Sequence, residues 1–158
     1  MDYNFLGKTI LIAEDDELSR YFFEKALKKT RANLFFVPDG MEALKMVGEN
    51  AEIDLVIMDI RLPRMDGIEA TKKIKALNPE LPVIIQTAYA LETVRDEALA
   101  SGCDEFITKP IRIETLLSIL RKHLIYWRNW LFERIYPDQN GITYPSMPWF
   151  DSFYPTGG

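Results

Sequence analysis

Short aliphatic runs alternate along the chain with longer segments whose apolar residues recur at helical spacing. The run KTILIA at 8–13 is followed by residues 17–30, where apolar side chains recur at helical spacing: Leu18, Tyr21, Phe22, Ala26 and Leu27. A short apolar run is typical of a buried strand, and a spacing of three or four residues is typical of a helix. Further strands are predicted at 33–37, 53–58, 82–87 and 104–108, and further helices from Asp39 to about Glu49, at 67–77, at about 91–101 and from Ile113 onward.

Polar residues and glycine at the helix ends support these boundaries. Asp39, and Asp66 with Glu69 three residues later, are expected to cap two helices by accepting hydrogen bonds from first-turn N–H groups. Gly102 is expected to close the fourth helix, because glycine readily adopts the left-handed conformation found at that place.

The alternation of strands and helices predicts an α/β domain, because helices that connect parallel strands cover both faces of the sheet. Such connections are right-handed, which limits the possible arrangements. The common five-stranded solution is a doubly wound, flavodoxin-like parallel sheet with the order 2-1-3-4-5. We therefore expect residues 1–124 to form one domain in which the carboxyl ends of the first and third strands lie side by side.

Charged residues directly follow three of the predicted strands. Asp15 and Asp16 follow the first strand, Asp59 the third and Lys109 the fifth. In an open parallel sheet these strand ends line the crevice where ligands bind. Carboxylates that meet there repel one another unless a cation joins them, and Mg²⁺ suits oxygen ligands. Taken singly, Asp15 or Asp16 could instead cap the first helix.

Asp59 is the expected chemical centre, because a carboxylate can accept a phosphoryl group to form an acyl phosphate. Transfer of that group needs neutralisation of charge more than covalent assistance. Lys109 supplies a positive charge, and Thr87, at the end of the fourth strand, supplies a hydroxyl beside the small Ala88. Thr is also an ordinary strand residue, which is the alternative for Thr87 considered alone.

These residues together resemble the receiver domain of two-component response regulators, and the resemblance covers residues 8 to about 124. The matching motifs are LIAEDDE with Asp15-Asp16, VIMDIRLPRMDG with Asp59, IIQTAYA with Thr87-Ala88, and FITKP with Lys109-Pro110.

The resemblance implies a phosphoacceptor and a metal site. Asp59 would take a phosphoryl group from a phosphohistidine on a sensor histidine kinase or a histidine phosphotransfer protein. Asp15, Asp16 and Asp59 would bind Mg²⁺ together with the main-chain carbonyl of Arg61. A receiver of this kind promotes its own phosphorylation and dephosphorylation, and it is not a dedicated enzyme unless it forms part of a hybrid histidine kinase.

The resemblance also implies a switch. Thr87 and Lys109 would grip the phosphoryl group, the bond before Pro110 would be cis, and Phe106 would turn inward behind Thr87. The readout would be a change in the surface of the fourth helix, fifth strand and fifth helix. Static packing of Phe106 in the core is an equal alternative.

Arg61 and Tyr89 stand two residues beyond Asp59 and Thr87. In the family these places influence how fast water attacks the acyl phosphate. Both side chains are large here, and we expect them to shield it.

Composition and sequence pattern argue against several other functions. The formal net charge of −5 argues against direct binding of nucleic acid. No apolar run reaches the roughly 18 residues of a membrane span, and no secretion signal is evident, so a cytoplasmic location is expected. A single cysteine and a single histidine, Cys103 and His123, cannot build a Cys/His metal cluster.

Residues 125–158 depart from the family pattern, since ten of the 19 aromatic residues and all three Trp lie there. The last helix is expected to continue to about 136, where Pro137 stops it, and the rest should be irregular. Three interpretations stay open: packing on the domain or on a second copy as a homodimer, docking of another protein, and an extension foreign to the natural protein.

Other functions stay open at this point. An aspartate-nucleophile phosphatase of the haloacid dehalogenase type also uses Asp and Mg²⁺ on an α/β sheet, although its DxD motif is absent from Glu14-Asp15-Asp16-Glu17. A degenerate receiver would act only as a binding module. A receiver could stand alone or come from a hybrid kinase.

Overall fold

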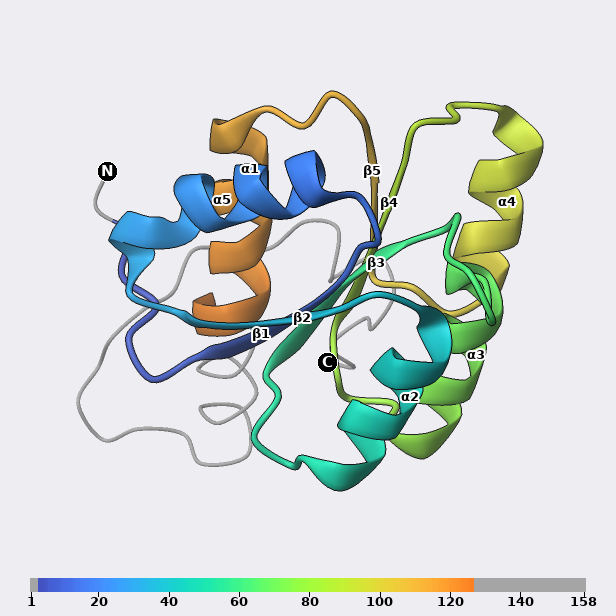
Figure 1. The fold of residues 1–158 in the computed structure, drawn as a ribbon, viewed down its shortest axis with the longest axis horizontal. Coiled ribbons are helices and arrows are strands. Elements are labelled where there is room, and N and C mark those ends of the chain that lie inside the picture. Colours follow the sequence, from blue (N-terminus) through green and yellow to red (C-terminus); the bar gives the residue numbers. More distant parts are fainter. Residues whose placement is uncertain (1–2, 127–158) are drawn as a thin grey trace, which may run out of the picture.

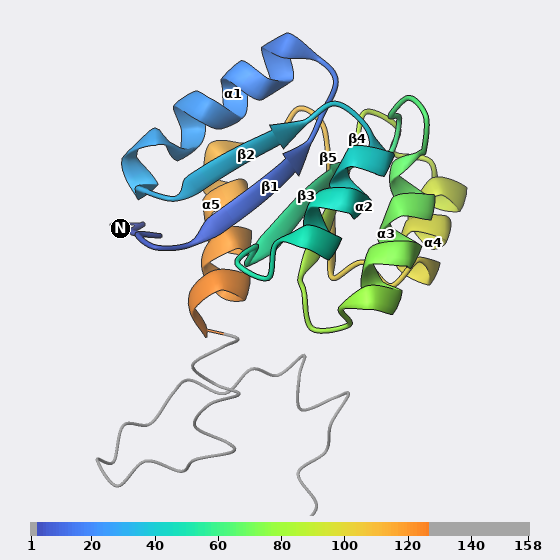
Figure 2. The ribbon, with the colours of Figure 1, turned by 60° about the horizontal axis from the view of Figure 1, so that its bottom comes forward.

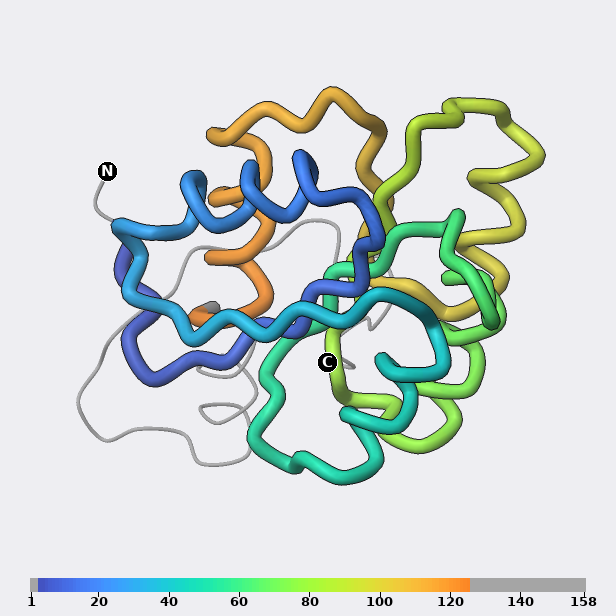
Figure 3. Tube along the Cα trace, viewed as in Figure 1, coloured from blue at the N-terminus to red at the C-terminus, as the bar shows by residue number. Residues whose placement is uncertain are grey.

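The computed structural model describes residues 3–126, and the expectations for residues 127–158 lie outside that part of the chain. The sheet is parallel, with the order β2-β1-β3-β4-β5, as predicted (Figure 1). The tube in Figure 3 shows how a helix follows each strand, and α1 to α4 each lead to the next strand. The strands are β1 (Thr9–Ala13), β2 (Asn33–Val37), β3 (Leu55–Asp59), β4 (Val83–Thr87) and β5 (Glu105–Thr108).

The helices form a layer on each face of the sheet. Figure 2 shows α1 and α5 on one face and α2, α3 and α4 on the other. Their bounds are α1 (Glu17–Leu27), α2 (Gly40–Glu49), α3 (Gly67–Leu77), α4 (Glu92–Ala100) and α5 (Ile113–Arg121), with a 3₁₀ turn at Lys28–Thr30 and a π-helical turn at Lys122–Tyr126. Strand and helix limits agree with the predicted ones to within three residues. The largest difference is at the end of the first helix, which tightens into the 3₁₀ turn.

The core has two halves because successive side chains of a strand point to opposite faces. β1, β3 and β4 are buried along their whole length, as expected for central parallel strands covered on both sides. Residues facing α1 and α5 include Ile10, Ile12, Leu55, Ile57 and Ile84. Residues facing the other three helices include Leu11, Val56, Met58, Val83 and Ile85.

The predicted helix ends are present. The side chain of Asp39 accepts a hydrogen bond from the Glu42 N–H group, and that of Asp66 accepts from Ile68 and Glu69. Gly102 has a φ angle of +90° just beyond α4. The caps by Asp39 and Asp66 satisfy backbone donors that a helix leaves without partners in its first turn.

His123 joins the turn after α5 to the sheet. Its Nε2 atom lies 3.3 Å from Oε1 of Glu105 on β5. The hydrogen bond from His123, with that from Lys122, outweighs burial and lowers the pKa of Glu105 to about 2. His123 therefore has a structural contact.

No helix within residues 3–126 has the length and apolar character needed to cross a membrane.

Gly67 keeps α3 close to the end of β3. Its N–H group donates to the carbonyl of Ile60, and a Cβ atom at Gly67 would overlap the main-chain carbonyl group of Asp59. We expect Gly67→Ala to lower the free energy of unfolding by about 1–3 kcal/mol, because the backbone has to shift to admit the methyl group. Urea denaturation would measure the change.

Gly48 is the matched control, because a Cβ atom there would meet nothing within 4 Å. Gly48→Ala should raise the free energy of unfolding by about 0.5–1 kcal/mol, since alanine loses less backbone freedom in a helix. Equal effects of the two substitutions would contradict the proposed overlap at Gly67.

Candidate functional site

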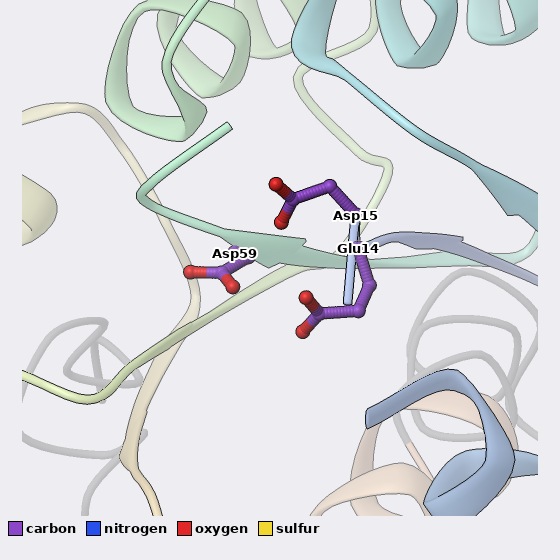
Figure 4. Close-up of side chains that lie close together, drawn as sticks. All are labelled: Glu14, Asp15 and Asp59. Atoms are coloured by element: carbon purple, nitrogen blue, oxygen red, sulfur yellow. The ribbon is translucent and has the colours of Figure 1, made fainter. Parts of the chain in front are cut away.

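Three carboxylates gather where β1 and β3 end. Glu14 and Asp15 directly follow β1, and Asp59 is the last residue of β3 (Figure 4). Ala13 and Met58 are partners in the register of these neighbouring strands, which brings the residues that follow them together. One carboxylate oxygen from each of Glu14, Asp15 and Asp59 lies within 4.8 Å of the others. The expected convergence of Asp15 and Asp59 is therefore present.

Asp16 does not belong to this cluster, which corrects the sequence expectation. Its carboxylate accepts a hydrogen bond of 2.8 Å from the Ser19 N–H group and caps α1. That backbone hydrogen bond lowers the pKa of Asp16. The physical reason is that Asp16 is already the N-cap of α1, so its carboxylate is used by the helix. Glu14 occupies the place in the cluster where Asp16 was expected.

Glu14 is a buried carboxylate held by several donors. It is fully shielded from solvent, and burial raises its pKa. Its Oε1 accepts from the Asp16 N–H group at 3.0 Å, and its Oε2 accepts from Lys109 and from Gln86 at 3.0 and 3.1 Å. A buried charge is tolerated only when its hydrogen-bonding capacity is met in this way.

Lys109 is the cation of the site. Its Nζ atom lies 3.0 Å from Glu14 Oε2 and 3.1 Å from Asp59 Oδ2, so one ammonium group joins two carboxylates. Burial alone would lower the pKa of Lys109, but the hydrogen bond to Glu14 and the charge of Asp59 outweigh it and raise the pKa. The peptide bond between Lys109 and Pro110 is cis, the isomer that the family resemblance implied.

Thr87 and Phe106 lie on the paired strands β4 and β5. Thr87 ends β4 and is buried, and its Oγ1 accepts a hydrogen bond of 3.1 Å from the Tyr89 N–H group. Phe106 on β5 is half-buried and packs against the core on the side of α2, α3 and α4. Its register partner is Ile85, which lies two residues before Thr87 on β4. Phe106 is therefore one two-residue strand repeat away from the level of Thr87.

Arg61 and Tyr89 contact each other beside the site. The guanidinium carbon of Arg61 lies 4.1 Å from the centroid of the Tyr89 ring, a cation–π contact between two loops. The N–H group of Arg61 also donates to Asp59 Oδ1 at 3.2 Å. The two side chains predicted to flank the phosphorylation site are therefore stacked together.

The cluster fits a hard divalent cation. Such ions prefer oxygen ligands and are held by one or more carboxylates together with water. Glu14, Asp15 and Asp59 offer three carboxylates around one point, and the single ammonium of Lys109 leaves an excess of negative charge there. The chemistry of these donors suits Mg²⁺, and Asp15 is exposed to solvent at this point.

Sequence reasoning missed two residues of the site, Glu14 and Gln86. Glu14 continues the face of Ile10 and Ile12, and that alternation along β1 was a signal for it. Gln86 follows the aliphatic residues Val83–Ile85 in β4, and an amide at that place was a weak signal that did not identify its partner.

Known proteins resemble the chain over this whole domain. Residues 10–121 match the response regulator receiver domain family. The transcriptional regulatory protein ZraR of Escherichia coli K12 is 37% identical over 117 residues, which are 74% of this chain and 26% of that protein. The chain therefore spans about a quarter of the length of this curated relative.

Two solved structures are similar in fold and sequence. The receiver domain of sensor histidine kinase PA1611 from Pseudomonas aeruginosa PAO1, with magnesium in its active site cleft, has a TM-score of 0.69 and 32% identity and covers 75% of this chain and 98% of its own. The Saccharomyces cerevisiae co-crystal of the phosphotransfer protein Ypd1 with the Ssk1 receiver domain gives a TM-score of 0.68, 25% identity and coverage of 75% and 89%.

The two neighbouring aspartates should respond differently to substitution. We expect Asp15→Ala to weaken Mg²⁺ binding by at least about tenfold, a loss that even indirect partners of a metal site often cause. Asp16→Ala should leave the affinity unchanged and lower thermal stability, because α1 loses its N-cap. Isothermal titration calorimetry and thermal unfolding would measure the two effects. A loss of Mg²⁺ affinity in Asp16→Ala alone would contradict the placement of Asp16 outside the acidic cluster.

Proposed function

Because the chain belongs to the response regulator receiver family, we propose that Asp59 accepts a phosphoryl group from a phosphohistidine of a sensor histidine kinase or a histidine phosphotransfer protein. The observation that carries this proposal is the contact of Lys109 with Asp59 within the acidic cluster. A carboxylate oxygen of Asp59 forms the new bond to phosphorus as the bond from phosphorus to the imidazole nitrogen breaks. The electron pair of the broken bond stays on that nitrogen, and the imidazole takes up a proton from water, which restores its neutral form.

Each residue of the site has a role in this proposal. Glu14, Asp15 and Asp59 would hold Mg²⁺, together with the main-chain carbonyl of Arg61. The ion would supply positive charge against the phosphoryl oxygens. Lys109 would neutralise a further oxygen. The hydroxyl of Thr87 would donate its proton, because within residues 3–126 its oxygen accepts from Tyr89 and donates to no other group.

The proposed signal is a change of the surface made by α4, β5 and α5. Thr87 would move toward the phosphoryl group, and Phe106, which is half-buried, would turn inward behind it. Such a switch shifts the population between two existing arrangements. The net charge of −5 does not favour nucleic acid as the direct target, so we assign the readout to protein contacts in the cytoplasm.

A surface beside the site suits the phosphodonor. An apolar pocket of about 330 Å³ lies between α1 and the segment after β5, lined by Leu18, Phe22, Lys109 and Ile111 among others. Leu18 is 80% exposed. A donor helix seated on these residues would lie next to Lys109, which contacts Asp59. In the yeast complex named above a receiver domain is joined to a histidine phosphotransfer protein.

Two other functions are less well supported. Membership of the receiver family over residues 10–121 weighs against a haloacid dehalogenase-type phosphatase. A receiver that only binds partners would not need the contacts among Glu14, Asp59 and Lys109.

Phosphorylation can be tested directly. Incubation with acetyl phosphate and Mg²⁺ should add one phosphoryl group, seen by intact mass, and Asp59→Asn should abolish the addition. Asp66→Asn is the matched control, because this carboxylate caps α3 and asparagine caps helices equally well. A wild-type protein that gains no phosphoryl group, or an Asp59→Asn variant that still does, would overturn the proposed function.

The stacked pair should prolong the phosphorylated state. We expect the Arg61→Ala, Tyr89→Ala double variant to lose phosphate several-fold faster than the wild type, because water reaches the acyl phosphate more easily. The decay of the phosphorylated mass after removal of acetyl phosphate would give the rate. Leu77→Ala, an exposed residue at the far end of α3, serves as control. Equal decay in all three proteins would rule out shielding.

A further inference from the structure

Gln86 is a polar side chain that lies completely buried within β4. It is the register partner of Asp59 on β3, so the two residues stand next to each other on the α1 and α5 face of the sheet. Ile84, two residues earlier, belongs to the apolar core on that same face. An amide therefore occupies a place where this strand otherwise has aliphatic side chains.

The amide of Gln86 has its donor directed at the acidic site. Its Nε2 atom donates to Glu14 Oε2 at 3.1 Å, across the strand that carries Asp59. Its Oε1 atom is buried and has no hydrogen-bond partner among the described residues. The reversed amide would direct Oε1 at the carboxylate and lose the hydrogen bond. Glu14 thus fixes the orientation of the amide, although this leaves an acceptor without a partner.

A buried acceptor without a partner is unfavourable, and an aliphatic residue would avoid it. Unsatisfied groups of this kind in folded proteins call for an explanation. The contact with Glu14 supplies one, because Glu14 is fully buried and its carboxylate needs donors.

The second contact of Lys109, with Asp59, makes the amide of Gln86 more important as a donor to Glu14. Its Nζ atom is shared between Glu14 and Asp59, at 3.0 and 3.1 Å. When Lys109 turns to a phosphoryl group on Asp59, the donors left to Glu14 among the described residues are the Asp16 N–H group and Gln86. Gln86 can hold Glu14 in place in both states, because its own hydrogen bond does not involve Asp59.

We propose that Gln86 is a positioning residue that acts through Glu14 to keep this carboxylate oriented for the divalent cation. This inference rests on the proposed function, since it concerns the same metal site. Gln86 touches neither phosphoryl group nor substrate in this proposal. It is neutral, so it orients the carboxylate without reducing the negative charge that attracts the cation.

The test is Gln86→Met, which keeps an unbranched side chain of similar length and removes the donor. We expect Mg²⁺ binding, measured by isothermal titration calorimetry, to weaken by about tenfold, as for other residues that orient a metal ligand. Gln86→Leu is a second apolar variant and should give the same loss. Ile84→Leu, a change of shape on the same face of β4, is the control and should leave the affinity unchanged.

A second background separates positioning from general packing. Glu14→Asp keeps a carboxylate but shortens it by one methylene group, which withdraws it from Gln86. In that background Gln86→Met should change the Mg²⁺ affinity by less than about twofold, because contacting residues are not additive. The same loss in both backgrounds, or no loss in either, would overturn the inference. Thermal unfolding of each variant shows that it is folded.

The two proposals fail in different ways. A wild-type protein that binds Mg²⁺ and is phosphorylated, but whose Gln86 variants bind Mg²⁺ equally well, would overturn only the role of Gln86. A wild-type protein that binds no Mg²⁺ would overturn the metal site and the positioning role together.

Discussion

The contact of one lysine with two carboxylates is the interaction on which the site depends. Glu14, Asp15 and Asp59 come within 4.8 Å of one another, where like charges repel. Lys109 offsets part of that repulsion by reaching both Glu14 and Asp59. It can do so because the strands are parallel, so the carboxyl ends of β1, β3 and β5 lie on the same side of the sheet. The fold therefore creates the electrostatic conflict and also supplies its partial solution.

Burial makes that balance sensitive to ligands. Glu14 is fully shielded and Asp59 is 7% exposed, so their charges interact more strongly than they would in water. Main-chain N–H groups of Asp16 and Arg61 hold one oxygen of each carboxylate in a fixed direction. The oxygens turned the other way are shared with Lys109, and this is the contact that an added phosphoryl group would compete for.

The aliphatic runs were enough to predict the sheet, because each central strand is buried on both faces and needs apolar residues throughout. Asp59 could be predicted because it ends the apolar run of β3, and Lys109 because it directly follows β5. The choice among Glu14, Asp15 and Asp16 could not be made from composition, since three consecutive acids differ only in which face they continue. Gln86 depended on a partner 72 residues away in sequence, which no local pattern reveals.

The charges of the site explain why a neutral amide suits position 86. Three carboxylates and one ammonium leave two negative charges, which a divalent cation would balance. A second lysine at that place could also hold Glu14, but it would cancel the charge that attracts the cation. An aliphatic residue would keep the charge and leave Glu14 with fewer donors. Glutamine meets both demands, at the cost of an Oε1 atom that finds no hydrogen-bond partner in the described part of the chain.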